Sequence, residues 1–232
     1  MTTHSPHKEI IVLSVGGSLI VPKQGIDTAF LAAFRTFVLR QTKRGRRFLI
    51  VTGGGRTARE YQQATDAVLK LKDEDKDWLG IHATRLNGQL LRNIFRDVAQ
   101  HVVIKNPTRK VAWNRPVLIA AGWKPGRSTD AVAVRLAKAY DAHTIINLSN
   151  IDAVYDKDPS VHKNAKRQHR MDWPSFRRLV GNIWSPGANH PFDPVAARLA
   201  HRSKMTVVVM GKNLKNVENY LSGKEFKGTR IE

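Results

Sequence analysis

The stretch Asn147-Leu-Ser-Asn-Ile-Asp-Ala-Val-Tyr-Asp-Lys-Asp-Pro159 decides the fold class of this chain. It follows a short apolar run, Thr144-Ile145-Ile146, which predicts a buried strand. Its polar groups should therefore emerge at the carboxyl end of a sheet, where open α/β sheets bind ligands. Ser149 and the residues after it supply hydroxyls, an amide, an aromatic ring and carboxylates. That set suits a purine, a ribose and a metal-bound phosphate, although a polar loop after a strand is an equally good interpretation of this stretch alone.

Three glycine-rich turns upstream favour the ligand-binding interpretation. Each follows an apolar run and precedes a helical pattern. Glycine lets backbone N–H groups approach a phosphate without a Cβ in the way, and a following helix N-terminus adds partial positive charge. Three such exits at one end of a parallel sheet predict two phosphate sites, one for each of two nucleotides. The turns are Gly16-Gly17-Ser18, Gly53-Gly54-Gly55 and Gly122 to Gly126.

Strand and helix patterns alternate along the whole chain. This alternation predicts an α/β fold, a three-layer αβα sandwich with a largely parallel central sheet. Residues 1–9 are expected to form a flexible tail and residues 10–232 a single domain. Strands are expected at 10–15, 47–52, 102–104, 116–121, 144–146 and 205–210. Helices are expected from Asp27, through Ala58 and Ala64, from about 79 to 99, and from about 128, 172, 193 and 214, with a charged break at 72–77, a loop at 185–191 and a polar tail at 228–232.

The composition excludes some classes of protein. With 39 Lys+Arg against 19 Asp+Glu, the formal net charge is +20, which attracts polyanions or phosphorylated metabolites. The basic residues are spread along the chain, so nucleic-acid binding is expected to be incidental. There are no cysteines, no apolar stretch approaches a membrane span, and residues 1–8 lack a signal-peptide core. A cytoplasmic protein without membrane contact is therefore expected.

Several common nucleotide and metal motifs do not occur in the chain. There is no G-x-x-x-x-G-K-[ST] run and no G-x-G-x-x-G after a strand, so neither a P-loop nor a dinucleotide fingerprint is supported. The histidines show no zinc-ligand spacing; His82, His143 and His190 are expected to be surface or packing residues. No metal-ligating side chains are therefore assigned.

Taken together, the segments resemble the amino acid kinase superfamily, and most closely the archaeal-type uridylate (UMP) kinases. The resemblance runs from about Ile10 to the C-terminus. Gly-x-Ser-Thr-Asp-Ala-Val-Ala at 126–133 and Asn-Ile-Asp-x-Val-Tyr-x-x-Asp-Pro at 150–159 are highly specific in combination. The resemblance also rests on five further segments: Val15-Gly-Gly-Ser-Leu19, Val51 to Arg59, Gly80-Ile-His-Ala-Thr-Arg-Leu-Asn87, Asp193 to Ala197 and Gly228 to Ile231.

The resemblance implies a UMP-binding lobe at roughly 10–143, an ATP-binding lobe at roughly 144–232, and transfer of the γ-phosphoryl group of ATP to UMP. It implies Mg²⁺ bound mainly through the ATP phosphates and a homohexameric assembly. Asp130 matches the aspartate that organises the reacting centre. The implied ATP-binding residues are Gly17, Ser18, Gly55, Arg59, Ser149, Tyr155 and Asp158. The implied UMP-binding residues are Gly54, Asp77, Trp123, Lys124, Pro125, Gly126, Arg127, Ser128 and Thr129.

One position departs from the pattern of the superfamily. Many members carry a lysine two residues before the first Gly-Gly pair, reaching the transferred phosphoryl group, and here that residue is Ser14. Some archaeal-type UMP kinases also lack this lysine, so its absence does not exclude activity. A cation must then come from elsewhere, and the candidates by position are Arg56, Arg59 and Arg127. Arg127 is preferred because it lies inside the loop expected to meet the UMP phosphate; a solvated loop arginine is an equally good interpretation.

Three other functions remain open at the level of the sequence. The fold could serve a non-catalytic nucleotide-binding or oxyanion-storage protein, a role that Ser14 makes conceivable and that the Arg-Ser-Thr-Asp loop and Asp77 disfavour. It could also serve a kinase of another small acid or phosphate, such as isopentenyl phosphate, carbamate or an amino acid. The histidine that isopentenyl phosphate kinases use near the second glycine loop is missing here. The last alternative is nucleic-acid binding driven by charge, which modest salt should abolish if it is incidental.

Overall fold

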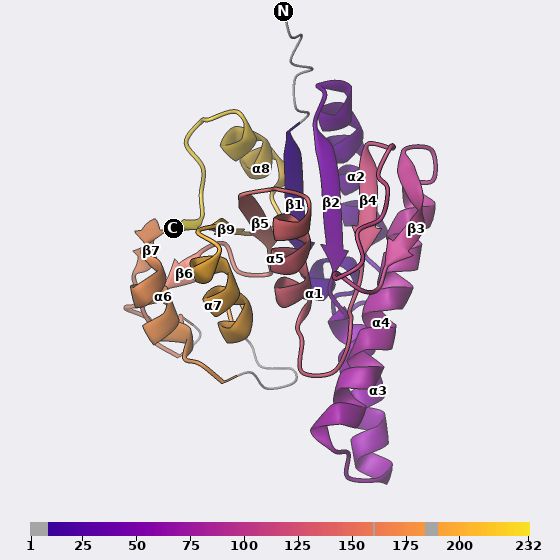
Figure 1. Cartoon of the computed structure of the whole chain (residues 1–232). Coiled ribbons are helices and arrows are strands. Elements are labelled where there is room, and N and C mark those ends of the chain that lie inside the picture. Colours follow the sequence, from indigo (N-terminus) through magenta and orange to yellow (C-terminus); the bar gives the residue numbers. More distant parts are fainter. Residues whose placement is uncertain (1–8, 160, 184–189) are drawn as a thin grey trace, which may run out of the picture.

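The computed structural model describes residues 9–159, 161–183 and 190–232 (Figure 1). The tail expected at residues 1–9 and the loop expected at 185–191 therefore lie largely outside the described residues. In the described part, eight strands form one sheet in the order β3-β4-β2-β1-β5-β9-β10-β8, and β6 pairs with β7 separately. The strands are β1 Ile10–Val15, β2 Arg47–Thr52, β3 Ala99–Ile104, β4 Val117–Ala120, β5 Thr144–Leu148, β6 Val154–Tyr155, β7 Arg167–Gln168, β8 Arg170–Met171, β9 Thr206–Met210 and β10 Thr229–Ile231.

The centre of the sheet is parallel, as the sequence predicts. Strand β1 pairs in parallel with β2 and with β5, and β5 with β9, whereas β10 is antiparallel to β9. The central strands are continuous apolar runs because helices cover both of their faces. All the carboxyl ends of β1, β2, β4, β5 and β9 consequently lie along one edge of the sheet, which brings the glycine turns and the Asn147 segment together.

Helices form the two outer layers. One hydrophobic cluster joins one face of the sheet to α5, α6 and α7, and a second joins the other face to α2, α8 and the end of α4. The prediction of a three-layer αβα sandwich is therefore confirmed. The helices are α1 Gly17–Ile20, α2 Thr28–Lys43, α3 Gly55–Val68, α4 Asp73–Ile94, α5 Thr129–Ala139, α6 Trp173–Val180, α7 Pro194–Arg202 and α8 Leu214–Leu221.

Side-chain caps fix where several of these helices begin. Asp27 accepts a hydrogen bond from the Phe30 amide, and Asp172 accepts one from the Ser175 amide. Each cap of this kind contributes about 1 kcal/mol to helix stability. The helix starts expected near 27, 128, 172 and 193 are confirmed, because Ser128 and Asp193 are also N-caps.

Three local predictions were wrong. The charged run at 72–77 is not a break: α4 begins at Asp73, because acidic residues in a first turn complement the partial positive charge of a helix N-terminus. The long helix ends at Ile94 instead of about 99, and Ala99 already belongs to β3. The polar tail at 228–232 contains β10, which pairs with β9 and β8.

Helices α3 and α4 project together beyond the carboxyl edge of the sheet (Figure 1). In α3 only Gly55 is buried, and Tyr61, Val68 and Leu69 at its surface are exposed. No helix in the described ranges is long and apolar enough to cross a membrane.

Candidate active site

The first two glycine turns pack directly against each other, backbone to backbone. A Cβ on Gly17 would lie 2.0 Å from the Gly55 nitrogen, and one on Gly53 would lie 2.4 Å from the Gly17 nitrogen. Gly55 also has φ of +66°, a conformation that L side chains rarely adopt. These glycines therefore have a packing role that the sequence did not reveal, besides the expected approach to phosphate. Gly54 is the N-cap of α3, and Ser18 lies half-buried in α1.

The Asn147 segment begins against the first glycine turn. The Gly16 amide donates a 2.8 Å hydrogen bond to the carbonyl oxygen of Leu148, and a Cβ on Gly16 would lie 3.6 Å from Cα of Ser149. Two of the segments expected to bind ATP are thus adjacent. This contact follows from the parallel pairing of β1 with β5, in which Ser14 is opposite Asn147.

The remaining residues expected on the ATP side lie farther along this segment. The Tyr155 hydroxyl donates a 3.0 Å hydrogen bond to Asp152, whose other carboxylate oxygen is 2.5 Å from Nζ of Lys227. Burial raises the pKa of the Tyr155 phenol, and the neighbouring Asp152 carboxylate raises it further. Asp158 is exposed. The ring of Tyr155 is therefore held in place by an acid–base pair that the sequence did not predict.

Asp130 joins three elements at the carboxyl edge. It is in the first turn of α5, its Oδ1 accepts a 2.8 Å hydrogen bond from the hydroxyl of Ser14 in β1, and its Oδ2 accepts one of 3.1 Å from the Asp193 amide at the start of α7. Desolvation by the surrounding protein raises the pKa of Asp130 to about 6, and the nearby Asp193 carboxylate adds to the rise while the Ser14 hydrogen bond opposes it. Asp130 thus has no cationic partner in β1, because Ser14 stands there.

Asp193 is a second carboxylate at this point and, unlike Asp130, it is buried; sequence reasoning gave it no functional role. Its Oδ1 caps α7 by accepting a 2.6 Å hydrogen bond from the Ala196 amide. Its Oδ2 is buried and has no hydrogen-bond partner among the described residues. Desolvation raises the pKa of Asp193, and the Ala196 amide opposes that rise. A buried carboxylate oxygen next to Asp130, with no hydrogen bond from the described residues, is suited to a cation or a hydrated metal ion.

The loop expected around UMP runs from Trp123 to Thr129, where α5 begins. Asp77 of α4 contacts it directly: its Oδ2 accepts a 2.7 Å hydrogen bond from the Gly126 amide. Burial raises the pKa of Asp77, and the Gly126 amide opposes that rise. Two cations lie over the indole of Trp123, with Nζ of Lys124 at 4.5 Å and Cζ of Arg135 at 5.5 Å from the ring centroid. Pro125 and Thr129 are half-buried in the same loop.

The three candidate arginines differ in their surroundings. Arg127 bends back to donate a 2.6 Å hydrogen bond to the carbonyl oxygen of Gly126. Arg56 forms an ion pair with Glu60, one turn along α3. Arg59 is exposed on α3. Arg127 belongs to the loop that also reaches Asp77, whereas Arg56 is already neutralised within its own helix.

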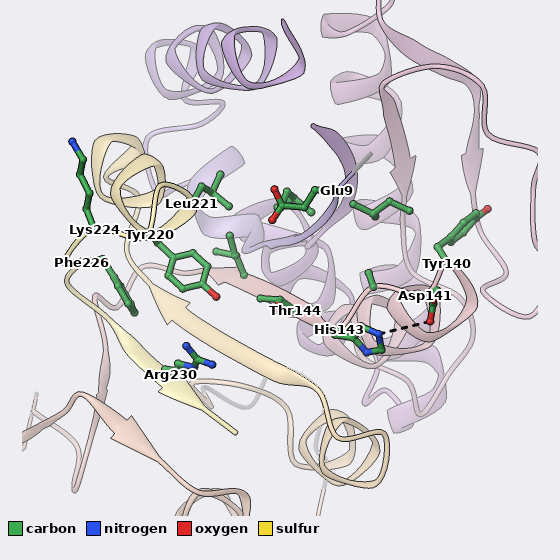
Figure 2. Close-up of a pocket in the computed structure, with 15 residues that line it drawn as sticks. Glu9, Tyr140, Asp141, His143, Thr144, Tyr220, Leu221, Lys224, Phe226 and Arg230 are labelled. Atoms are coloured by element: carbon green, nitrogen blue, oxygen red, sulfur yellow. Dashed lines mark ion pairs between the residues drawn. The ribbon is translucent and has the colours of Figure 1, made fainter. Parts of the chain in front are cut away.

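A cavity of about 780 Å³ lies elsewhere, at the amino ends of β1 and β5 (Figure 2). Tyr220 and Phe226 line it on one side and Thr144 lies between them and α5. Its charged groups balance, since Glu9 and Asp141 offset Lys224 and Arg230. The cavity is thus at the opposite end of the strands from the glycine turns and does not share their residues.

The fold and the carboxyl edge of the sheet together define a class: an α/β protein whose parallel strands end in three glycine turns, beside the half-buried Asp130 and the buried Asp193. The family model described as "Amino acid kinase family" matches residues 9–211. The chain therefore belongs to the amino acid kinase family.

The relatives within this family carry a consistent name. The chain is 33% identical over 230 residues to a uridylate kinase of Thermoplasma volcanium, covering 97% of this chain and 98% of the relative. It is 33% identical over 228 residues to a uridylate kinase of Thermococcus sibiricus, covering 96% and 99%. The crystal structure of uridylate kinase from Archaeoglobus fulgidus superposes with a TM-score of 0.81 at 28% identity, covering 96% of this chain and 99% of that one. A UMP kinase of Bacillus anthracis, at 20% identity and a TM-score of 0.78, shares the fold.

Proposed function

We propose that this protein is a nucleoside monophosphate kinase that transfers the γ-phosphoryl group of ATP to UMP, giving UDP and ADP for pyrimidine nucleotide synthesis. The observation that carries the proposal is the half-buried Asp130, held by Ser14 and the Asp193 amide where β1, α5 and α7 meet. The loop after β4 leads directly into it, and the first two glycine turns lie at the same edge. The near full-length similarity to archaeal uridylate kinases supports the choice of UMP.

The chemistry requires positioning and charge neutralisation more than covalent participation. In phosphoryl transfer, negative charge spreads over the equatorial oxygens of the transferred group. Hydrogen-bond donors that are already in place stabilise this charge and so lower the barrier. In this proposal the glycine turns hold the ATP phosphates, and Tyr155 lies against the base. Asp77 and the loop 123–129 hold UMP. Asp130 orients donors at the reacting centre, and Arg127 or Arg59 supplies the cation that Ser14 does not.

Magnesium is the expected metal, carried by ATP. In the described part of the chain no three acidic or histidine side chains gather into a metal site. The fit therefore rests on two carboxylates: Asp130, and Asp193, whose Oδ2 accepts no hydrogen bond from the residues that the structure describes. Both suit a hard cation that keeps most of its water and phosphate ligands. When bound, such an ion withdraws charge from the phosphates, and these two aspartates would hold its inner waters.

A coupled ADP-release assay tests the proposal. Purified protein with ATP and Mg²⁺ is compared on UMP, CMP, dUMP and isopentenyl phosphate. UMP-dependent turnover is expected, and Asp130→Asn should reduce it at least about 100-fold, as loss of transition-state organisation does. If ATP and UMP bind by calorimetry while no acceptor yields ADP, the kinase assignment fails and a binding or storage role replaces it.

We also propose that the protein assembles with copies of itself, through the projecting α3–α4 pair, into a hexamer. The support is apolar surface: Val68 is 88% and Leu69 is 70% exposed, and such residues close together at a helix end favour association. Light scattering coupled to size exclusion tests this. Val68→Glu with Leu69→Glu should lower the mass, whereas Val161→Glu, another exposed apolar position, should not. If the mass of the assembly is unchanged in the double variant, α3 does not form the interface.

A further inference from the structure

The motif Gly80-Ile-His-Ala-Thr-Arg-Leu-Asn87 has no assigned role in the site so far. It forms the middle of α4, which lies beside β2 and β4 and continues past the carboxyl edge of the sheet (Figure 1). Residues three, four or seven apart on a helix share a face. The side chains on the inner face of this motif contact two different loops: the glycine turn after β2 and the loop after β4.

Arg85 holds the loop after β4 by its carbonyl oxygens. Its Nε donates a 3.2 Å hydrogen bond to the carbonyl oxygen of Gly122, and its terminal nitrogen donates one of 2.9 Å to that of Trp123. The same guanidinium lies 5.9 Å from the centroid of the Trp78 ring. A planar guanidinium can meet two adjacent carbonyl oxygens at once, and a lysine ammonium matches that geometry less well.

Two neighbours on α4 support the same loop. The Thr84 hydroxyl accepts a 2.8 Å hydrogen bond from the Gly122 amide and donates one of 2.6 Å to the Ile81 carbonyl oxygen. Asp77, two turns earlier, accepts from the Gly126 amide. The loop is thus attached to one rigid helix at both of its ends, through both its amide and its carbonyl groups.

Asn87 performs the corresponding task for the glycine turn after β2. Its Nδ2 donates hydrogen bonds of 2.8 Å to the carbonyl oxygen of Gly53 and 3.2 Å to that of Gly54. Asn87 is 3% exposed. Next to it, Gly88 leaves room for the sheet, since a Cβ there would lie 3.3 Å from both Oγ1 of Thr52 and Cβ of Ala121. The helix therefore approaches both strand exits closely.

We infer that Arg85 and Asn87 are positioning residues, through which α4 sets the distance between the acceptor loop (residues 122–126) and the glycine turn Gly53–Gly55. This inference rests on the proposed function, which places the acceptor nucleotide at the first loop. Positioning matters because a displacement of about 1 Å in a site of this kind can cost about 100-fold in rate. Neither side chain needs to touch a substrate, because each acts on backbone that does.

The test compares two arginines of the same helix. Arg85→Met removes both carbonyl contacts, whereas Arg92→Met removes a half-buried arginine whose side chain forms hydrogen bonds with Asn93 and His101 and not with either loop in the described part of the chain. Dissociation constants for UMP and for an ATP analogue are measured by calorimetry, and kcat and KM by ADP release. Arg85→Met should weaken UMP binding about 10- to 100-fold, the effect of losing hydrogen bonds from a charged donor, with the ATP analogue changed less than about threefold. The dissociation constant of Arg85→Lys for UMP should lie between those of the unmodified protein and Arg85→Met. Arg92→Met should bind both nucleotides as the unmodified protein does.

Asn87 has its own matched pair. Asn87→Asp preserves shape but presents an acceptor to the Gly53 and Gly54 carbonyl oxygens, and Asn93→Asp makes the same change at an exposed position of α4. Asn87→Asp should lower kcat about 10-fold or more, because the glycine turn moves relative to the acceptor loop. Asn93→Asp should leave kcat unchanged.

The outcomes separate this inference from the proposed function. If the unmodified protein neither binds nor turns over UMP, the proposed function fails. If it does, but Arg85→Met behaves as Arg92→Met, or weakens UMP and ATP equally, the positioning role is wrong. Circular dichroism and thermal unfolding identify variants that do not fold. If Arg85→Met does not fold, Arg85→Lys replaces it in the test. If Arg85 is only structural, Arg85→Lys should show no loss of affinity that is specific to UMP.

Discussion

The hydroxyl of Ser14 donates a 2.8 Å hydrogen bond to Oδ1 of Asp130, across 116 residues of sequence. A neutral, buried side chain therefore stabilises the carboxylate at the centre of the proposed site, at the position where the resemblance to the superfamily leads us to expect a lysine. One hydrogen bond compensates desolvation less completely than an ammonium ion does. Desolvation therefore outweighs the Ser14 hydrogen bond and raises the pKa of Asp130.

Ser14→Ala should move the acid limb of the activity profile to higher pH. The Ser14 hydrogen bond lowers the pKa of Asp130, so its loss should raise that pKa above its value of about 6 by roughly 0.5–1 unit, the equivalent of one neutral hydrogen bond. The measurement is kcat/KM for UMP between pH 5 and 8, which reports groups of the free enzyme. Ser222→Ala, at the exposed C-cap of α8, is the control. An unmoved limb would mean that Asp130 does not govern it.

Asp130→Asn should stabilise the folded protein at neutral pH while impairing turnover. The folded pKa, about 6, lies above the ordinary value of 3.8, so the ionised carboxylate destabilises the fold above pH 6 and ceases to do so below about pH 4. The free energy of unfolding of the variant should exceed that of the unmodified protein by on the order of 2 kcal/mol at pH 8. The difference should shrink as pH falls through 6. Urea unfolding at pH 8 and pH 4.5 measures both, with Asp141→Asn, an exposed position, as control. A difference independent of pH would contradict the assignment.

Gly17→Ala should destabilise the fold severely, whereas Gly80→Ala should not. The added methyl at position 17 would lie 2.0 Å from a backbone nitrogen, but at position 80 only the flexible end of Gln62 comes within 3.2 Å. Overpacking against backbone costs about 3 kcal/mol or more. Alanine in the middle of α4 gains up to about 1 kcal/mol in helix propensity. Chemical denaturation of both variants measures the difference in their free energies of unfolding. Equal values would show that the first two glycine turns can move apart to accommodate the methyl group.

Asp77→Ala should weaken UMP binding about 10-fold without a comparable effect on ATP. It removes the acceptor for the Gly126 amide, leaving one end of the acceptor loop unattached. Asp75→Ala, an exposed residue in the first turn of the same helix, is the matched control. Calorimetry with each nucleotide makes the measurement. Equal losses for UMP and ATP would place Asp77 outside the acceptor site.

The fold could be predicted largely from local patterns. Apolar runs such as Ile10–Val15 and caps such as Asp27 determine strands and helix starts through neighbouring residues alone. The wrong predictions have the same origin. The charged run that opens α4 resembles a break when only its own residues are considered, and the segment at 228–232 resembles a tail because its partner strand is distant in sequence.

The site could be predicted only in part. Motifs located the loops and Asp130, because glycines and carboxylates after strands have recognisable spacing. Arg85 and Asn87 gave no such signal, since a polar residue on a helix predicts only a solvent-facing side chain until the loops beside it are known. The partner of Ser14 was likewise inaccessible from sequence, and so was the unpaired oxygen of Asp193.

The contact between Gly17 and Gly55 has a consequence for how such a protein can diversify. Because those two turns meet through main-chain atoms, their spacing is inherited from the pairing of β1 with β2 and cannot be retuned by exchanging side chains. The acceptor loop and the residues that follow it, by contrast, carry replaceable groups such as Trp123 and Arg127. Under the proposed function, evolution can therefore change which molecule is phosphorylated while the glycine turns that we propose hold the ATP phosphates stay constant. New acceptor preferences in chains of this type should map to residues 123–129, and hardly ever to the glycine turns.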